Sequence, residues 1–203
     1  MRLCRWVVAA VLVGAAVGCS GGGKRPGSPP AQRPPSSSTV AFDVSVGGVA
    51  SVDQPPPPLA DEVRAKVAAV LERYLDAAVL TPLRSGERAG DLASVFTAAA
   101  LARVNGPDRP ALVDEGLPKA AALRAESSSA RLGALVGGDK AVSVVTATID
   151  LRLDTGGSDR VTIARNGDLV LVPDGGDWRI DGYDVRTTRD SADGAVSTTA
   201  TRR

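Results

Sequence analysis

Histidine is absent from this 203-residue sequence, and cysteine occurs only at Cys4 and Cys19, both near the N-terminus. The long remainder therefore has no disulfide, and it lacks the nitrogen and sulfur ligands that zinc and copper sites use. The absence of histidine also removes the commonest general base and every Ser-His-Asp or Cys-His arrangement. We accordingly predict no metal, no cofactor and no catalytic residue of these types.

An excess of either charge is also lacking. The 24 basic and 23 acidic residues give a formal net charge of +1, and they are spread along the chain. No basic stripe of the kind that neutralises phosphates is present, so we expect no nucleic-acid partner. Aromatic residues make up 3% of the sequence, and most of those beyond the first segment are Tyr74, Phe96, Trp178 and Tyr183.

No apolar run reaches the roughly 20 residues that a membrane-spanning helix needs. The run from Trp6 to Gly18 is shorter, and Arg2 and Arg5 precede it. A positive start, an apolar stretch and a small-residue end are typical of a secretory signal peptide, which we predict over residues 1–18.

The four residues at the end of this run, Ala16-Val17-Gly18-Cys19, resemble the bacterial lipobox. The resemblance implies cleavage after Gly18, attachment of a diacylglycerol to the thiol of Cys19, and a lipid anchor of the palmitate type. We therefore expect a lipoprotein on the outer face of the cytoplasmic membrane. The alternative is ordinary cleavage and secretion, because Ala16 stands where leucine is commonest, and Cys19 is then a plain apolar-region cysteine.

Residues 19–58 are expected to form the anchor and a linker. Ser20 to Thr39 consists mainly of Gly, Ser, Pro and basic residues, which bury too little apolar surface to offset the entropy of ordering. Such a flexible segment spans about 25 Å on average. Residues 40–46 alternate in polarity and predict a possible short strand, which Gly47 and Gly48 would end.

Helical periodicity dominates the next part of the chain. From Asp61 to Leu80, apolar residues recur at steps of three and four, which predicts a long N-terminal helix with Pro82 just beyond its end. A second helix is predicted from Asp91 to Asn105. A short third helix is predicted from Arg109 to Glu115, with Pro110 in its first turn.

Beyond Leu117 the apolar period becomes two, which predicts a run of long antiparallel strands. The predicted strands lie within residues 120–136, 142–153, 160–172 and 178–188. Arg165-Asn166-Gly167 is predicted to form a bulge in the third of them. The segment 191–203 has no apolar period and is predicted to be a disordered tail.

The last of these strands changes phase. Trp178 and Ile180 share one parity, whereas Tyr183 and Val185 share the other. Successive side chains of a strand point to opposite faces. All four can therefore face one core only if one residue between the two pairs is left unpaired in a bulge. We predict a bulge at Asp181-Gly182 and, because bulges bend sheets, a strongly curved sheet.

The order of helices followed by antiparallel strands is an α+β layout. Several segments resemble an actinobacterial lipoprotein group with an NTF2-like, cone-shaped domain. They include Pro82-Leu83-Arg84-Ser85-Gly86, Gly116-Leu117-Pro118, Asn166-Gly167-Asp168-Leu169 and the W-x-I-x-x-Y-x-V pattern from Trp178 to Val185. The resemblance covers residues 59–190. It implies a curved sheet wrapped around the first helix, with a pocket at the open end, and it carries no activity over to this chain.

Two classes of function remain open. In the first, the domain is a non-catalytic extracytoplasmic module that binds a small apolar ligand, a lipid or an envelope protein. Tyr74, Phe96, Trp178 and Tyr183 would then line the mouth of the cone, and the alternative for all four is core packing. In the second, the domain is a small cofactor-free acid/base enzyme, and the available groups are Tyr74, Tyr183, Asp150, Asp181 and Asp184.

Overall fold

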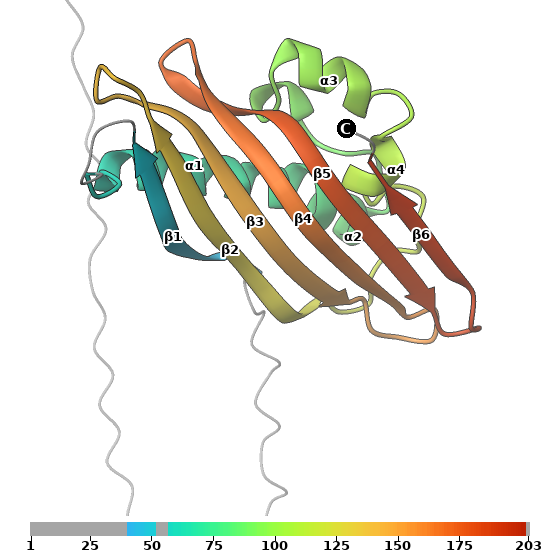
Figure 1. The fold of residues 1–203 in the computed structure, drawn as a ribbon. Coiled ribbons are helices and arrows are strands. Elements are labelled where there is room, and N and C mark those ends of the chain that lie inside the picture. Colours follow the sequence, from blue (N-terminus) through green and yellow to red (C-terminus); the bar gives the residue numbers. More distant parts are fainter. Residues whose placement is uncertain (1–39, 52–56, 202–203) are drawn as a thin grey trace, which may run out of the picture. The chain divides into compact units, whose positions relative to one another are not determined.

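The computed structural model describes residues 40–51 and 57–201. The predicted signal peptide, Gly18, Cys19 and most of the linker lie outside the described residues, so they stay predictions. In the described part, six strands form one sheet in the order β1-β2-β3-β4-β5-β6. The helices lie on one face of this sheet (Figure 1), and the class is α+β, as predicted.

The sheet is mixed. Its strands are β1 (Asp43–Ser51), β2 (Arg124–Val136), β3 (Val142–Asp154), β4 (Val161–Asp174), β5 (Asp177–Ser191) and β6 (Val196–Ala200). The pairs from β2 to β6 are antiparallel, but β1 pairs with β2 in parallel. The prediction of an antiparallel sheet is therefore wrong at this edge. A parallel pair needs a long crossover connection, and here the whole helical region supplies it.

Strand β1 extends further than the predicted strand at residues 40–46. It runs through Gly47 and Gly48 to Ser51, and its register shifts between Val46 and Gly48. A Cβ at Gly47 would lie 2.7 Å from side-chain carbons of Arg131 on β2. The first glycine thus makes room for Arg131 at a bulge, and the strand continues past it.

The predicted disordered tail contains a strand. Val196–Ala200 forms β6, which pairs with β5 from Arg186 to Asp190. The Thr201 hydroxyl then accepts a hydrogen bond from the backbone N–H of Val185 over 2.8 Å. The prediction is wrong here because the pairing depends on backbone hydrogen bonds at an open sheet edge, which leave no apolar period in the sequence.

Three helical segments follow one another without a break: α1 (Asp61–Tyr74), a π-helical segment (Leu75–Leu80) and α2 (Thr81–Ser85). Pro82 lies in the first turn of α2 rather than beyond the helix, and Gly86 ends α2 with a φ of 74°. Proline has no N–H for the preceding turn. The carbonyls of Ala77 and Ala78 accept instead from the N–H groups of Gly90 and Asp114, each over 2.9 Å.

The predicted helix from Asp91 to Asn105 is divided. A 3₁₀ turn (Leu92–Ser94) is followed by α3 (Ala98–Val104), and α4 (Arg109–Leu112) comes next. Between the first two, the Ile180 N–H donates to the Val95 carbonyl and the Thr97 N–H donates to the Ile180 carbonyl, over 2.9 and 3.0 Å. Phe96 thus adds a short parallel bridge beside β5, and the backbone there is extended instead of helical.

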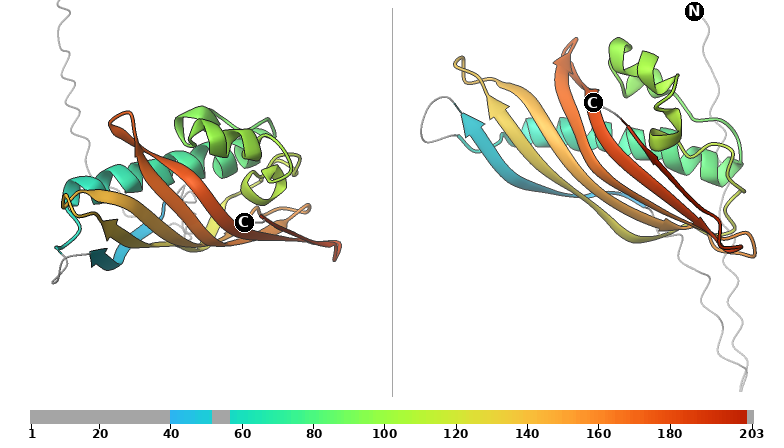
Figure 2. Two further views of the ribbon diagram at one scale, coloured as in Figure 1. Left: turned by 45° about the horizontal axis from the view of Figure 1, so that its top comes forward. Right: turned by 45° about the vertical axis from the view of Figure 1, so that its right-hand side comes forward.

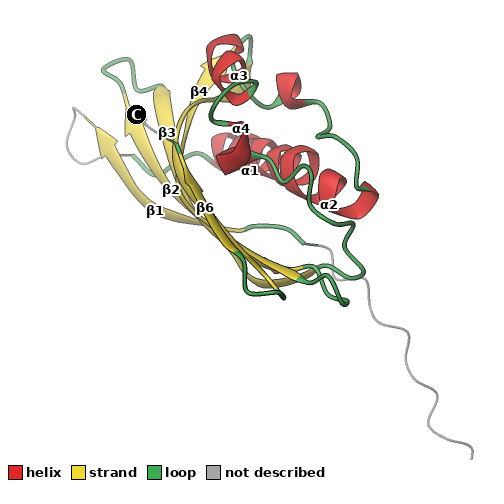
Figure 3. Ribbon diagram, turned by 90° about the vertical axis from the view of Figure 1, so that its right-hand side faces the viewer, coloured by secondary structure: helices red, strands yellow, loops and turns green. Residues whose placement is uncertain are grey.

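The predicted bulge in β5 is confirmed. Gly182 pairs with Val170 and Ile180 pairs with Leu171, so Asp181 is the extra residue. The predicted bulge at residues 165–167 is wrong, because β4 pairs with β3 in continuous register there. Regular alternation therefore directs Arg165 into the core. The sheet curves with the helices on its concave face, as three further views show (Figures 2 and 3).

Candidate functional site

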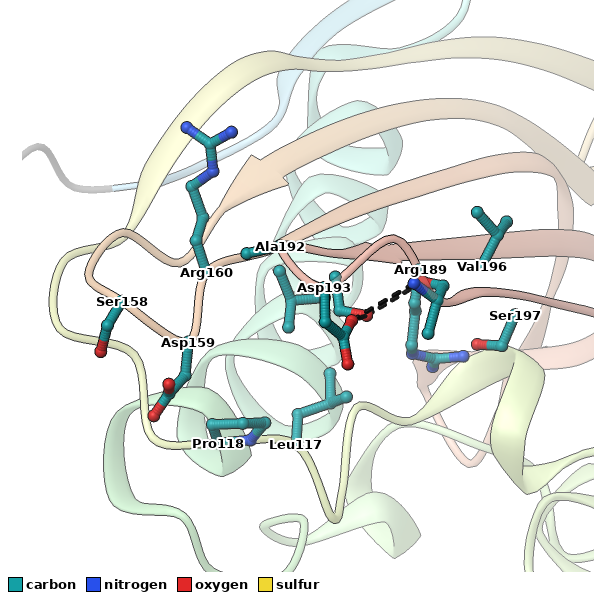
Figure 4. A pocket seen from close by; sticks show the side chains of 13 residues that line it. Leu117, Pro118, Ser158, Asp159, Arg160, Arg189, Ala192, Asp193, Val196 and Ser197 are labelled. Atoms are coloured by element: carbon teal, nitrogen blue, oxygen red, sulfur yellow. Dashed lines mark hydrogen bonds between the residues drawn. The ribbon is translucent and has the colours of Figure 1, made fainter.

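An open pocket of about 370 Å³ lies where three connecting segments meet at one end of the sheet (Figure 4). The segments are the β3–β4 turn, the β5–β6 turn and the loop between α4 and β2. Its apolar lining includes Leu117, Pro118, Val161 and Val196, and Val196 is 67% exposed. Small-molecule sites in proteins occupy about 300–1,000 Å³ and are mainly apolar, so the pocket has the size and character of a small site.

Hydrogen bonds tie the two turns that border the pocket to each other. The Ala192 N–H in the β5–β6 turn donates to the Arg160 carbonyl in the β3–β4 turn over 3.0 Å. Within the β5–β6 turn, Asp193 accepts from the Ser191 hydroxyl and from the Ala195 N–H. These two donors, the hydroxyl first, hold the pKa of Asp193 below its usual range. The walls are thus ordered by contacts within the chain.

Arg189 forms part of the pocket wall and continues into the interior. Its Nη2 donates to Oδ1 of Asp114 over 2.6 Å, and its Nε donates to the same oxygen over 3.0 Å. Nη2 also donates to the Pro110 carbonyl over 2.8 Å. Charge-assisted bonds of this kind are the stronger hydrogen bonds of proteins. These hydrogen bonds hold the Arg189 side chain in one position, so it forms a fixed part of the pocket wall.

Asp114 is the centre of a buried polar cluster that we define as Tyr74, Asp114, Arg165, Thr187 and Arg189. Arg165 donates from Nη2 to Asp114 Oδ2 over 2.8 Å, and from Nε to the Thr187 hydroxyl over 2.9 Å. The Thr187 hydroxyl donates onward to the Ala111 carbonyl over 2.7 Å. The cluster therefore joins α4 and its following loop to the inner face of β4 and β5.

Burial acts on the pKa values of Tyr74 and Arg165 in this cluster. Burial raises the pKa of Tyr74, whose hydroxyl donates to the Leu112 carbonyl over 3.1 Å. Burial alone would lower the pKa of Arg165, but the charge and hydrogen bond of Asp114 act together with Tyr74 against it, and the pKa of Arg165 is raised. The guanidinium also lies over the Tyr74 ring, 6.0 Å from its centroid. Arg165 is thus a permanent buried cation, held by the Asp114 carboxylate, the Thr187 hydroxyl and the Tyr74 ring.

The four aromatic residues predicted to line a cone mouth are all packed into the core. Tyr74 and Phe96 are 0% exposed, Trp178 is 5% exposed and Tyr183 is 8% exposed. Phe96 meets Tyr74 and Tyr183 edge to face, with centroids 6.1 and 6.3 Å apart. A ligand in contact with Tyr74 or Phe96 would have to displace core side chains, so the open pocket is the more accessible site.

The predicted acid/base residues are not gathered into one enclosed site. Asp150, Asp181 and Asp184 are exposed, and Asp181 accepts from the Thr97 hydroxyl over 2.8 Å. Tyr183 donates its hydroxyl to Asp108 over 2.9 Å. Burial and then this bond raise the pKa of Tyr183 to about 12. A general base of this kind needs a carboxylate in a buried site beside its substrate, and these three carboxylates lie on the surface.

Sequence reasoning missed Asp114, Arg165 and Arg189. One signal was present, because Arg165 shares its parity with Val161, Ile163, Leu169 and Leu171 along β4. A charged residue on the apolar parity of a strand indicates a buried ion pair. Nothing in the sequence identified Asp114 as its partner, since 51 positions separate the two.

Within residues 40–51 and 57–201, no group of three or more Asp, Glu, His or Cys residues is placed to hold a metal ion. The same ranges contain no helix with the length and apolar character needed to cross a membrane. The chain matches no protein-family model, no curated protein and no solved structure.

Proposed function

We propose that this chain is a membrane-tethered extracytoplasmic lipoprotein whose domain is a non-catalytic binding module for an apolar small molecule or a single lipid chain. The open pocket beside Arg189 is the observation that carries the proposal. Its walls combine Leu117, Pro118, Val161 and Val196 with the hydroxyls of Ser158 and Ser197. A ligand with an apolar body and a polar end would contact the apolar walls with the first and the serine hydroxyls with the second.

The proposed fold type is NTF2-like. A curved sheet with α1 and α2 on its concave face supports this proposal, as does the W-x-I-x-x-Y-x-V pattern from Trp178 to Val185. In this chain the concave face is filled by side chains of the core, among them Leu71, Phe96 and Ile149. The binding module would therefore use the end of the sheet instead of its centre.

The tether is proposed from Ala16-Val17-Gly18-Cys19. A lipid on Cys19 and a linker of about 25 Å average span would keep the domain close to the membrane surface. Lipid chains would then be available at high local concentration. An envelope protein that binds the same pocket is the other source of an apolar group.

The anchor is tested by fractionating cells and analysing the mass of the purified protein. We expect a membrane-bound form that carries a diacylglycerol on Cys19 and begins at that residue. The variant Cys19→Ser should lose the lipid. Recovery of unmodified protein in the culture fluid would refute the lipid anchor, and it would leave the proposal of ligand binding in the pocket unaffected.

Binding is tested on the full chain with a fluorescent fatty-acid analogue. We expect saturable binding that weakens at least fivefold in Val196→Ser, because this substitution removes an exposed apolar wall. Val46→Ser is the matched control, since Val46 is an exposed valine on β1 outside the pocket. Equal loss in both variants, or no binding to the unaltered chain, would refute the pocket assignment.

A further inference from the structure

Much of the outer face of the sheet, opposite the helices, is left open by the described elements and carries a row of small residues. Register pairs link Gly48, Gly133, Thr146, Val170 and Gly182, one from each of β1 to β5. Two hollows of about 420 and 550 Å³ lie along this row and share Thr146, and Arg103 of α3 and Tyr183 also line the larger one. The row is thus the floor of a groove that crosses five strands.

Packing within the chain does not account for two of the three glycines of this groove, whereas a Cβ at the third, Gly182, would contact the Val170 side chain at 3.5 Å. A Cβ at Gly48 would meet nothing within 4 Å, and a Cβ at Gly133 would meet only the Thr146 carbonyl at 4.0 Å. Neither glycine has a positive φ. Glycine inside a strand costs about 0.5–1 kcal/mol relative to alanine, and it is common where another backbone approaches closely.

The two banks of the groove differ in chemistry. One bank is apolar, with Leu135 at 47% exposure beside Val144, to which it is paired. The other bank is the next row of outward-facing residues, in which Arg131 pairs with Thr148 and Thr148 with Asp168. Asp168 pairs in turn with Asp184 on β5. The positive end of this polar bank is therefore on β2, and the negative end is on β4 and β5.

We propose that this face binds a second copy of the chain, through a two-fold axis that lies between the two sheets and runs parallel to the strands above β3. Such an axis brings β2 of one protomer opposite β4 of its partner. Val170 then sits over the partner's Gly133, and Arg131 meets the partner's Asp168. Each contact occurs twice, because a two-fold interface is self-complementary.

The other two-fold axis in the interface plane, perpendicular to the strands, is disfavoured by the same residues. It would place β2 against the partner's β2, so Arg131 would face apolar side chains such as the partner's Leu135. The charge order along the polar bank thus selects the axis parallel to β3. Stacked sheets lie about 10 Å apart, and the glycine floor lets Val170 fill the space between them.

The proposal is tested by sedimentation of the full chain in a mild detergent, with charge reversals on either side of the contact. We expect Arg131→Glu and Asp168→Arg each to weaken self-association at least tenfold, because each sets like charges opposite one another. An equal mixture of the two variants should recover association, since one pair of opposite charges is restored on one side and the native pair is kept on the other. Lys119→Glu, the same charge change on an exposed loop, should leave association unchanged.

A second measurement does not depend on the stability of those variants. Residues of β3 face their own copy across the axis, so Thr146→Cys should give a dimer with a short thiol-reactive crosslinker. Thr162→Cys, on β4 at the far end of the sheet, and the unaltered chain should not. A monomer at all concentrations, unchanged association in both reversals, or no crosslinking at Thr146 would each overturn the proposal.

Discussion

The Arg165 guanidinium donates to the Asp114 carboxylate over 2.8 Å, and neither side chain has any exposed surface. Arg165 belongs to the middle of β4, whereas Asp114 follows α4 and is also held by the Ala78 carbonyl through its own N–H. One buried ion pair therefore connects the sheet, the short helix and the π-helical segment. The pair makes the position of the pocket loop depend on the core.

Replacing Asp114 with asparagine should lower the free energy of unfolding by about 3–5 kcal/mol, because it leaves Arg165 as a buried charge without a counter-charge. Urea unfolding measures the change. Asp61→Asn is the matched control, since Asp61 pairs with Arg64 at 91% and 50% side-chain exposure. An exposed pair contributes at most about 1 kcal/mol. Equal losses in the two variants would contradict a dominant role for the buried pair.

Stability should fall as the pH rises from about 10 to about 12. The pKa of Tyr183 is raised from 10.0 to about 12 in the folded protein, first by burial and then by Asp108. Its stabilising contribution is thus complete below the unfolded pKa, and it is lost as the pH rises through the folded pKa. Unfolding in urea at several pH values measures the slope.

Tyr183→Phe should show a smaller slope over the same range. The only other tyrosine of the sequence, Tyr74, is fully buried and keeps its own contribution. Identical slopes in the two proteins would show that the loss of stability at high pH comes from other groups.

Gly167→Ala should destabilise the domain by about 3 kcal/mol or more. Gly167 has a φ of 141°, and a Cβ there would lie 2.0 Å from the Asp184 carbonyl on β5. Both the backbone conformation and the overlap are costly. Gly138→Ala is the control, because a Cβ there meets nothing within 4 Å, and its thermal midpoint should stay close to that of the unaltered chain.

Deleting Asp181 should remove the bulge and leave the domain folded. Without the extra residue, Ile180 and Tyr183 stand two positions apart, so a regular strand points both of them into the core. The deletion loses the Thr97 and Arg103 hydrogen bonds to Asp181, at about 1 kcal/mol each. Near-ultraviolet circular dichroism, which reports Tyr183 and Trp178, should therefore stay close to that of the unaltered chain. A deletion variant that fails to fold would contradict this account of the bulge.

The bulge in β5 could be predicted because it is a local conflict. In a regular strand, the pair Trp178 and Ile180 would face one side of the sheet and the pair Tyr183 and Val185 would face the other. Gly182 lies between the two pairs, beside the bulged residue. The strands β2 to β5 follow from the same period-two signal. Side-chain alternation is thus sufficient wherever one face of a strand is buried.

The remaining features depend on partners far away in the sequence. Strands β1 and β6 lie at the sheet edges, and their backbone pairing leaves little trace in side-chain polarity. The π-helical segment depends on carbonyls of Ala77 and Ala78 that bond to Gly90 and Asp114. Periodicity predicts a bulge at Arg165-Asn166-Gly167 instead of a buried arginine, because the partner of Arg165, Asp114, lies 51 positions away and cannot be found from periodicity.

The parallel pairing of β1 also sets an order of events during folding. Asp43 pairs with Ser129, and all the described helices lie between them in the chain. A chain made from its N-terminus forward therefore holds residues 43–51 unpaired until β2 exists. Closing so long a loop is slow, so the strand nearest the linker joins the sheet late. The end of the domain that leads in synthesis is thus among the last parts to become ordered.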